Sequence, residues 1–136
     1  MSVRPARAVD DLTIRRLLDA AVLEVDDVEG YLEAGTVLVA VSDSDSERIL
    51  GTLVYEPLDA PPTNSGAHIV AIAVRKRRQG QGIGTQLVET ALDRYGRLTA
   101  TFDEPVRPFY DTLGFSIEPL DDGRYAGVLD TVHPRP

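Results

Sequence analysis

The chain lacks cysteine altogether, and only one of its 136 residues is lysine. Without cysteine, neither a disulfide framework nor a thiolate metal site can form. No segment approaches the ~20 consecutive apolar residues of a membrane-spanning helix, and the first residues lack the apolar run of a signal peptide. We therefore expect a soluble, cytoplasmic protein that holds no metal and does not enter a membrane.

Acidic residues outnumber basic ones by 22 to 14, which gives a net charge of -8, and Asp outnumbers Glu by 14 to 8. A surface rich in Asp and poor in Lys keeps a protein solvated at high salt, as in the acidic proteome of a halophile. A GC-rich genome, which favours Arg over Lys, explains the composition equally well. The charge argues against nucleic acid as the main partner, because neutralising phosphates needs a broad basic face.

The length and the 43% hydrophobic content fit one domain spanning residues 1–136. Strands and helices are predicted in mixed order from the apolar periodicity. The predicted strands cover 3–9, 36–42, 48–56, 68–74, 97–102, 115–120 and 124–130, and the predicted helices cover 11–21, 27–35, 83–95 and 107–113. The strand 68–74 is a nearly continuous apolar run, typical of a central strand covered on both faces. Residues 57–67 are too rich in Pro and Gly for regular structure, and 131–136 reads as a frayed tail.

A cationic, glycine-rich segment follows the strand 68–74. Four basic residues, at 75–78, precede Gly80, Gly82 and Gly84, and the helical pattern begins at Ile83. A glycine turn between a buried strand and a helix leaves backbone N–H groups unpaired at the positive end of the helix dipole, where an anion can approach them closely. The segment therefore predicts a phosphate-binding turn.

Two common nucleotide motifs fit this turn poorly. A P-loop needs Lys and then Ser or Thr after its last glycine, whereas Gly84 is followed by Thr85 and Gln86. A dinucleotide fingerprint is a closer competitor, because Asp103 lies where a ribose-binding acid is expected. The third glycine is misplaced for it, however, and the chain has too few parallel strand–helix–strand units for a doubly wound sheet.

Two motifs resemble the signatures of the GNAT superfamily of N-acetyltransferases. The segment IAVRKRRQGQGIGTQLV is similar to its acyl-CoA binding motif Q/R-x-x-G-x-G/A, and PFYDTLGF is similar to its F-Y-x-x-x-G-F signature. The matching residues are Gln79, Gly82 and Gly84 in the first motif and Phe109, Tyr110, Gly114 and Phe115 in the second. The motif-bearing part runs from Ile69 to Phe115, and the first half of the chain agrees only in pattern.

The resemblance implies an α/β (α+β) fold, with a mixed, mostly antiparallel sheet of about seven strands and about four helices, splayed open at the acyl-CoA site. It also implies that the acetyl group of acetyl-CoA passes by direct attack, in a ternary complex, to a primary amine of a small molecule or protein. The acceptor amine cannot be read from this sequence. Dimers are common in the family, which leaves a homodimer open.

The cofactor-binding residues follow from the same resemblance. The backbone of Ile72 and Val74 would bond the pantetheine arm, and the Val74 N–H would stabilise the oxyanion. The amides that would hold the pyrophosphate belong to Gln79, Gly80, Gln81, Gly82, Ile83, Gly84 and Thr85.

Three side chains are candidates for proton transfer, because an alkylamine is almost wholly protonated at neutral pH. The family's tyrosine at the position of Tyr110 commonly protonates the departing thiolate; the alternative role is core packing beside Phe109. His68 stands where the family often carries a base, and its alternative is a surface histidine at the strand mouth. Glu104 is a weaker candidate, since a carboxylate there is more often a helix cap or a solvated side chain.

The sequence departs from the family pattern near Tyr110. Asp103 replaces an Asn whose amide often reaches the cofactor, and an ionised carboxylate cannot donate. Pro105 and Pro108 predict a helix that starts late, near Arg107, which would displace Tyr110. These departures keep open an alternative function, a CoA-binding module without catalysis, such as a sensor or a partner subunit. Turnover separates the two, because both would bind CoA and only the enzyme would release free thiol with an amine.

Overall fold

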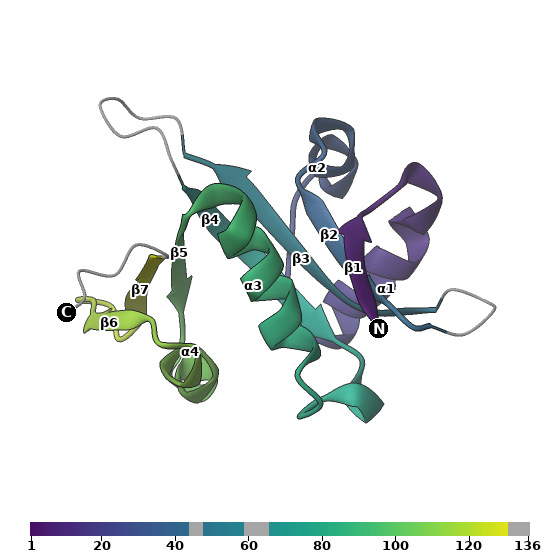
Figure 1. Cartoon of the computed structure of the whole chain (residues 1–136). Helices are drawn as coiled ribbons and strands as arrows, with labels where there is room; N and C mark the ends of the chain where they lie inside the picture. Colours follow the sequence, from purple (N-terminus) through teal and green to yellow (C-terminus); the bar gives the residue numbers. More distant parts are fainter. Residues whose placement is uncertain (44–47, 59–65, 131–136) are drawn as a thin grey trace. The chain divides into compact units, whose positions relative to one another are not determined.

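The computed structural model describes residues 1–43, 48–58 and 66–130 (Figure 1). Its strands form a seven-stranded sheet in the order β1-β2-β3-β4-β5-β7-β6. The strands are β1 (Ser2–Pro5), β2 (Val37–Val41), β3 (Ile49–Pro57), β4 (Ala67–Val74), β5 (Arg97–Phe102), β6 (Ser116–Pro119) and β7 (Tyr125–Asp130). The helices are α1 (Asp11–Ala20), α2 (Val28–Ala34), α3 (Ile83–Tyr95) and α4 (Arg107–Leu113), with short 3-10 turns η1 (Ala8–Asp10), η2 (Lys76–Arg78) and η3 (Glu104–Val106).

The sheet is mixed and mostly antiparallel, as predicted. The pairs β1–β2, β2–β3, β5–β7 and β6–β7 are antiparallel. Only β4 and β5 form a parallel pair among the described registers, through Ala67–Ile69 and Leu98–Ala100. The helix α3 connects these two strands, which is the crossover that a parallel pair requires.

Three of the four helices end at a glycine with positive φ. Gly35 (φ 75°), Gly96 (φ 77°) and Gly114 (φ 93°) follow α2, α3 and α4. A residue in this conformation ends a helix because its amide turns back to the last carbonyls, and glycine adopts the conformation without a steric penalty. The predicted ends of these helices at Gly35 and Gly96 are confirmed.

The first strand is shorter than predicted. The expected strand covered 3–9, whereas β1 ends at Pro5 and η1 begins at Ala8. The carboxylate of Asp10 accepts hydrogen bonds from the Arg7 backbone N–H at 2.8 Å and from the Arg4 guanidinium at 2.9 Å. These bonds turn the chain before α1, a local competition that period-2 patterning does not reveal. The predicted tail 131–136 and most of the predicted loop 57–67 lie outside the described residues.

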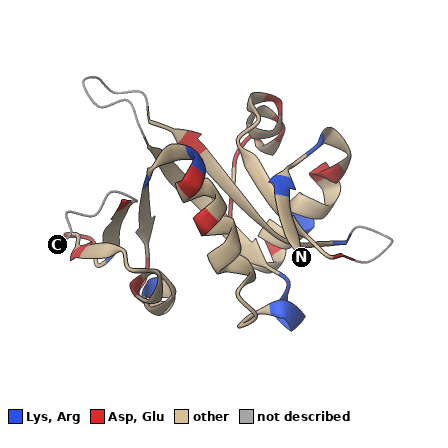
Figure 2. Cartoon of the chain, in the orientation of Figure 1, with Lys and Arg blue, Asp and Glu red and all other residues tan. Residues whose placement is uncertain are grey.

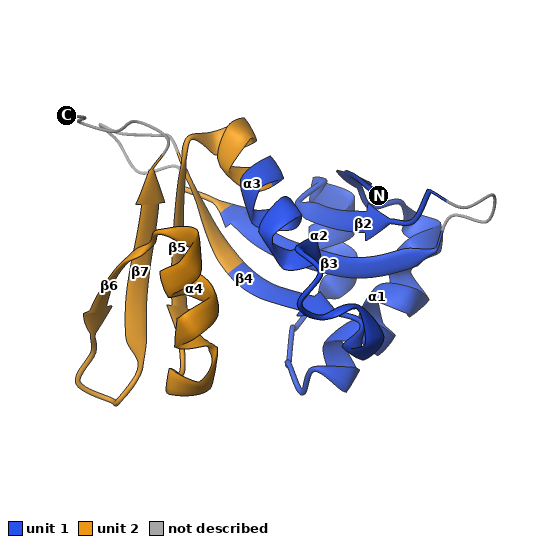
Figure 3. Ribbon diagram, turned by 60° about the horizontal axis from the view of Figure 1, so that its bottom comes forward, with its two compact units in different colours: residues 1–56, 70–90 blue, residues 57–69, 91–136 orange. Residues whose placement is uncertain are grey.

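Two compact units are distinguished within the chain (Figure 3). The first comprises residues 1–56 and 70–90, and the second comprises 57–69 and 91–136. The boundaries fall inside β3, β4 and α3, so each of these elements contributes residues to both units.

In the first unit, helices cover both faces of the strands. Side chains of α1 and α2 pack with Val37, Val39 and Val41 of β2, which share one face by alternation. Ala40 lies on the opposite face and pairs with Gly51 of β3. A Cβ atom on Gly51 would lie 3.1 Å from Ile83 of α3 and 3.0 Å from the Ala73 carbonyl oxygen. The close approach of α3 to this face therefore depends on glycine at position 51.

In the second unit, an aromatic cluster packs on β5 and β7. Phe102, Tyr110 and Phe115 are all buried. A Cβ on Gly127 of β7 would lie 3.1 Å from Phe115 and 3.2 Å from Phe102. The bare backbone of Gly127 thus makes room for two rings of the cluster.

None of the helices in the described ranges is long and apolar enough to span a membrane.

Candidate functional site

The glycine turn before α3 presents bare backbone to open space. Gly80 and Gly82 adopt φ values of 80° and 82°, and nothing lies within 4 Å of where a Cβ of either residue would stand. Positive φ favours glycine on conformational grounds alone. The turn leads directly into α3, which begins at Ile83.

The amides of this turn have unused donor capacity. Among the described turn and loop bonds, Gly80, Gln81 and Gly82 donate none, and the first N–H groups of α3 have no acceptor within the helix. Gly80, Gln81 and Gly82 are exposed, whereas Gly84 and Thr85 are half-buried. The turn and the helix start therefore offer N–H donors without a described acceptor, a geometry that suits an anion.

Alternate backbone N–H groups of β4 point away from β3. The Arg75 N–H donates to the Leu50 carbonyl of β3 at 2.9 Å. Because successive N–H groups along a strand point to opposite edges, the Val74 N–H and the Ile72 N–H point away from β3. Beyond Ile69 no pairing of β4 with β5 is described. The two backbone groups predicted to bond the pantetheine arm thus lie on an edge with open hydrogen-bonding capacity.

The two faces of β4 differ in burial. Ala67, Ile69, Ala71 and Ala73 are buried, whereas the alternate residues, from His68 to Val74, are half-buried. The prediction of a strand covered on both faces is therefore wrong for β4 and describes β2 and most of β3 instead, whose residues are buried throughout. Small apolar residues occupy the buried face of β4, and its more open face carries the predicted site residues.

Gln79 bridges the glycine turn and the strand. Its side-chain amide Nε2 donates to the Val74 carbonyl oxygen at 3.4 Å, and the side chain is exposed. The bond is long, so it adds little stability. It nevertheless shows that the glutamine of the predicted motif folds back on the end of β4.

Tyr110 is buried in the aromatic cluster of the second unit. Its ring stacks on Phe102 with centroids 4.2 Å apart and meets Phe109 and Phe115 edge to face at 5.1 and 5.0 Å. Burial raises the pKa of Tyr110 to about 12, so its hydroxyl keeps its proton at neutral pH. No hydrogen bond from this hydroxyl to a described residue is present in the structure. The packing role predicted beside Phe109 is confirmed, and the proton remains available.

His68 lies at the start of β4 and contacts the next strand. Its Nδ1 is 2.7 Å from the Thr99 hydroxyl of β5, and the imidazole is half-buried. If Nδ1 donates to Thr99, Nε2 is left with a lone pair and can accept a proton; the other tautomer reverses these roles. The contact restrains the ring, which is what a positioned base requires.

Asp103 and Glu104 have other partners in the second unit. Asp103 accepts from Arg124 Nε at 3.0 Å, and Glu104 accepts from the Tyr125 hydroxyl at 2.5 Å. Arg107 lies over the Tyr125 ring, 4.8 Å from its centroid. Both carboxylates thus have partners at an exposed surface, Glu104 in β7 and Asp103 in the residue before it. Glu104 is exposed as the solvated alternative predicted, but it bonds Tyr125 and is not the cap of η3.

The late start of α4 is confirmed. The 3-10 turn η3 precedes it, and α4 begins at Arg107 with Pro108 in its first turn. Proline is tolerated there because its missing N–H would have no intrahelical partner. Even so, Tyr110 is buried against β5 through Phe102.

The structure places the predicted site residues in two groups. Ile72, Val74 and the amides of 79–85 follow one another through β4, the turn and α3 of the first unit, whereas His68 and Tyr110 belong to the second. The sequence analysis missed Thr99 as the partner of His68, because a parallel register between β4 and β5 carries no local signal. It also missed Arg124 as the partner of Asp103.

Comparisons with known proteins agree with this geometry. The family model described as the acetyltransferase (GNAT) family matches residues 11–115. An acetyltransferase of the GNAT family from Listeria monocytogenes has a similar fold, with a TM-score of 0.73, 16% identity, and coverage of 95% of this chain and 94% of that one. No curated protein sequence matches the chain.

Two further solved structures contain CoA or a CoA derivative. A Mycobacterium tuberculosis protein in complex with CoA has a TM-score of 0.77 at 17% identity, with 97% of this chain and 100% of that chain covered. An Arabidopsis thaliana protein in complex with the bisubstrate analogue CoA-Ac-MVNAL has a TM-score of 0.75 at 17% identity, with 95% and 97% covered. At such identities the likeness establishes the fold.

Proposed function

Because the chain belongs to the acetyltransferase (GNAT) family, whose members are acyl-CoA dependent transferases, we propose that it acetylates a primary amine of a small molecule or a protein. The observation that carries this proposal is the glycine turn. Gly80 and Gly82 hold positive φ with open space beside them, directly before the N-terminus of α3. This arrangement suits the pyrophosphate of acetyl-CoA, which would supply an activated acetyl thioester.

Two sets of backbone groups would bind different parts of acetyl-CoA. The amides from Gln79 to Thr85 would hold the pyrophosphate through backbone donors, and the β4 edge at Ile72 and Val74 would hold the pantetheine arm. The predicted splay of the sheet would admit that arm, and the described β4–β5 pairing over only Ala67–Ile69 supports it. The Val74 N–H, directed away from β3, would then donate to the developing oxyanion.

Direct transfer to the amine needs a proton acceptor and a proton donor. Tyr110, protonated at neutral pH because burial raises its pKa to about 12, would give its proton to the departing thiolate. His68, restrained by Thr99, would accept the proton of the amine directly or through water. An acyl-cysteine intermediate cannot form within these 136 residues, because none is cysteine.

Relatives of the fold support an amine on an amino acid or peptide without identifying it for this chain. The bisubstrate analogue in the Arabidopsis thaliana structure joins CoA to a peptide through an acetyl group. The acceptor would contact segments that carry no diagnostic motif, so its identity must come from experiment.

The product linkage tests this function. The protein would be incubated with isotope-labelled acetyl-CoA and mixed amines, amino acids and peptides, and labelled products would be detected by mass spectrometry before and after hydroxylamine treatment. We expect a labelled product that survives hydroxylamine, because amides resist it and esters do not. Tight CoA binding with no labelled product from any amine would favour a CoA-binding module instead, and a hydroxylamine-sensitive product would overturn N-acylation.

A further inference from the structure

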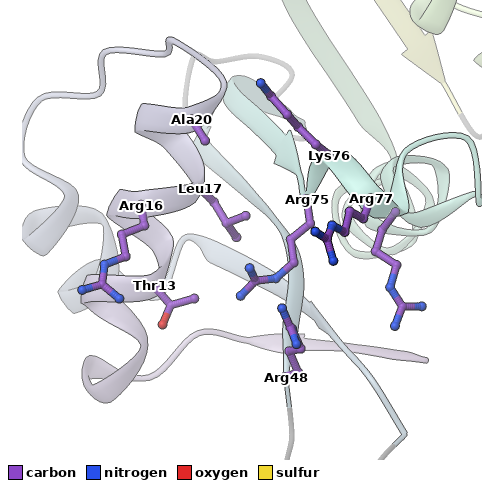
Figure 4. A pocket seen from close by; sticks show the side chains of 9 residues that line it. Thr13, Arg16, Leu17, Ala20, Arg48, Arg75, Lys76 and Arg77 are labelled. Carbon is purple, nitrogen blue, oxygen red and sulfur yellow. The ribbon is translucent and has the colours of Figure 1, made fainter.

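A strongly basic cavity lies within the first unit, apart from the glycine turn. Its volume is about 520 Å³, and α1, the residue before β3 and the segment after β4 line it (Figure 4). Its basic lining residues are Arg16, Arg48, Arg75, Lys76, Arg77 and Arg78. These are six of the 14 basic residues in a chain whose net charge is -8. Figure 2 shows the basic run around η2 as a continuous blue segment. Among the residues that the structure describes, no acidic residue lines the cavity.

Two arginine side chains of the cavity, those of Arg48 and Arg75, extend toward each other (Figure 4). Arg75 is half-buried, and its Nε donates to the Ile49 carbonyl oxygen at 2.6 Å, which fixes the direction of its guanidinium. The guanidinium of Arg48 points toward that of Arg75, while Lys76 extends away from both (Figure 4). Thr13 and Leu17 of α1 face the same space and add a hydroxyl and an apolar wall.

The charges of this cavity lack compensation by described carboxylates. Arg4, Arg15 and Arg124 each form a salt bridge with an aspartate elsewhere in the chain. None of the six cavity residues forms one with a carboxylate in residues 1–43, 48–58 or 66–130. Burial and the nearby Arg48 lower the pKa of Arg75, the electrostatic cost expected of crowded like charges.

We propose that this cavity binds a small molecule carrying more than one phosphoryl group, at a site separate from the glycine turn. Guanidinium groups match phosphate oxygens through paired N–H donors, and several of them on one wall favour a multiply charged ligand. The volume lies in the range of small-molecule sites, about 300–1,000 Å³. Leu17 and Ala20 offer apolar surface to an organic part of the ligand.

The separation of the two sites rests on their residues. The cavity is lined by side chains, and none of its lining residues is among the cofactor-binding residues Ile72, Val74 and 79–85. The turn, in contrast, offers backbone amides. Arg78 of the cavity directly precedes Gln79 of the turn, so titration into CoA-saturated protein is the test of whether both sites bind anions at once.

Inorganic tripolyphosphate is a suitable probe. We would titrate it by calorimetry at low ionic strength, where surface charges are least screened, into protein already saturated with CoA. We expect one bound tripolyphosphate, and we expect the double variant Arg16→Gln, Arg48→Gln to weaken binding by at least roughly tenfold, since hydrogen bonds to charged groups are lost. The control, Arg15→Gln with Arg97→Gln, removes the same charge at residues that do not line the cavity and should leave binding within about twofold, because the attraction of a charge falls with its distance from the ligand.

Three results would overturn the proposal. Wild-type protein saturated with CoA could fail to bind tripolyphosphate. The control variant could lose as much affinity as the cavity variant, which would reveal diffuse attraction only. CoA could displace tripolyphosphate while dephospho-CoA does not, which would assign the cavity to the 3′-phosphate of the cofactor. The displacement experiment uses wild-type protein, so it remains decisive even if a variant fails to fold.

Discussion

The glycine turn of the first unit and the aromatic cluster of the second differ in which part of the residue would do the chemistry. At Gly80 and Gly82 there is no side chain, and the exposed backbone N–H groups would be the donors. At Tyr110 the backbone is helical, and the function would depend on one hydroxyl fixed by three aromatic contacts. A backbone site needs particular φ values, whereas a side-chain site needs a packed surrounding. We therefore expect the glycine turn to be sensitive to changes of backbone conformation and the aromatic cluster to be sensitive to loss of the hydroxyl.

The largest effect is expected at the glycine turn, where Gly82→Ala should sharply weaken CoA binding. Alanine at φ 82° is strained, so the turn would relax and misplace its amides. Losing hydrogen bonds to a charged ligand should raise the Kd for CoA by roughly 10- to 100-fold. Calorimetric titration of CoA measures this change.

Gly123→Ala is the matched control for that substitution. Gly123 has φ 83° and, like Gly82, nothing within 4 Å of its would-be Cβ, but it lies in the β6–β7 turn. It should lose similar stability and keep its CoA affinity. Equal loss of affinity in both variants would mean that strain, and not the amides of the turn, explains the result.

At the aromatic cluster we expect Tyr110→Phe to lower kcat by at least about tenfold, within the usual range for loss of a general acid. The KM for acetyl-CoA should change little, because the ring and its stacking on Phe102 remain. Steady-state kinetics on the purified variant give both constants. An unchanged kcat would leave Tyr110 with a packing role alone.

A smaller effect is expected at the hydrogen bond between His68 and Thr99. Removing the base with His68→Gln should lower kcat more than Thr99→Val, which leaves the imidazole but frees it to rotate. We expect losses of roughly tenfold and about threefold, below the full range for general base catalysis because water can substitute. Steady-state kinetics on both variants, with the acceptor amine at saturation, give the two kcat values. If Thr99→Val reduces kcat as strongly as His68→Gln, the contact has a structural role.

The smallest effect concerns stability at alkaline pH. The raised pKa of Tyr110, about 12 against a usual value of 10, means that the folded state retains a proton which the unfolded state loses. Its contribution is fully present below pH 10 and decreases as the pH rises toward 12, by at most about 1.4 kcal/mol per pH unit. Urea unfolding between these values should show this slope in the wild type and a shallower one in Tyr110→Phe. Parallel slopes would contradict the assigned burial.

Sequence reasoning predicted the backbone site better than the side-chain contacts. Glycine at 80, 82 and 84 before an apolar helix specifies a turn through local conformational preference, and the structure confirms the turn. Gly35 and Gly96 likewise revealed helix ends. The partner of His68 depends on the register of β4 against β5, which tertiary packing decides. The end of β1 at Pro5, short of the predicted strand 3–9, depends on the bonds of Asp10 to Arg4 and Arg7.

The basic residues of the cavity also could not be grouped from the sequence. The run at 75–78 was visible in the sequence, but its convergence with Arg16 and Arg48 requires α1 and the start of β3 to lie beside it. Those residues are about 30 or more positions away along the chain, so no local pattern joins them.

The most direct test of the central claim is the release of free CoA from acetyl-CoA across a panel of amines, polyamines, amino acids and peptides. The account predicts release that depends on the amine, saturates with it and falls in Tyr110→Phe. Tight CoA binding with no release above the amine-free rate for any acceptor would contradict it.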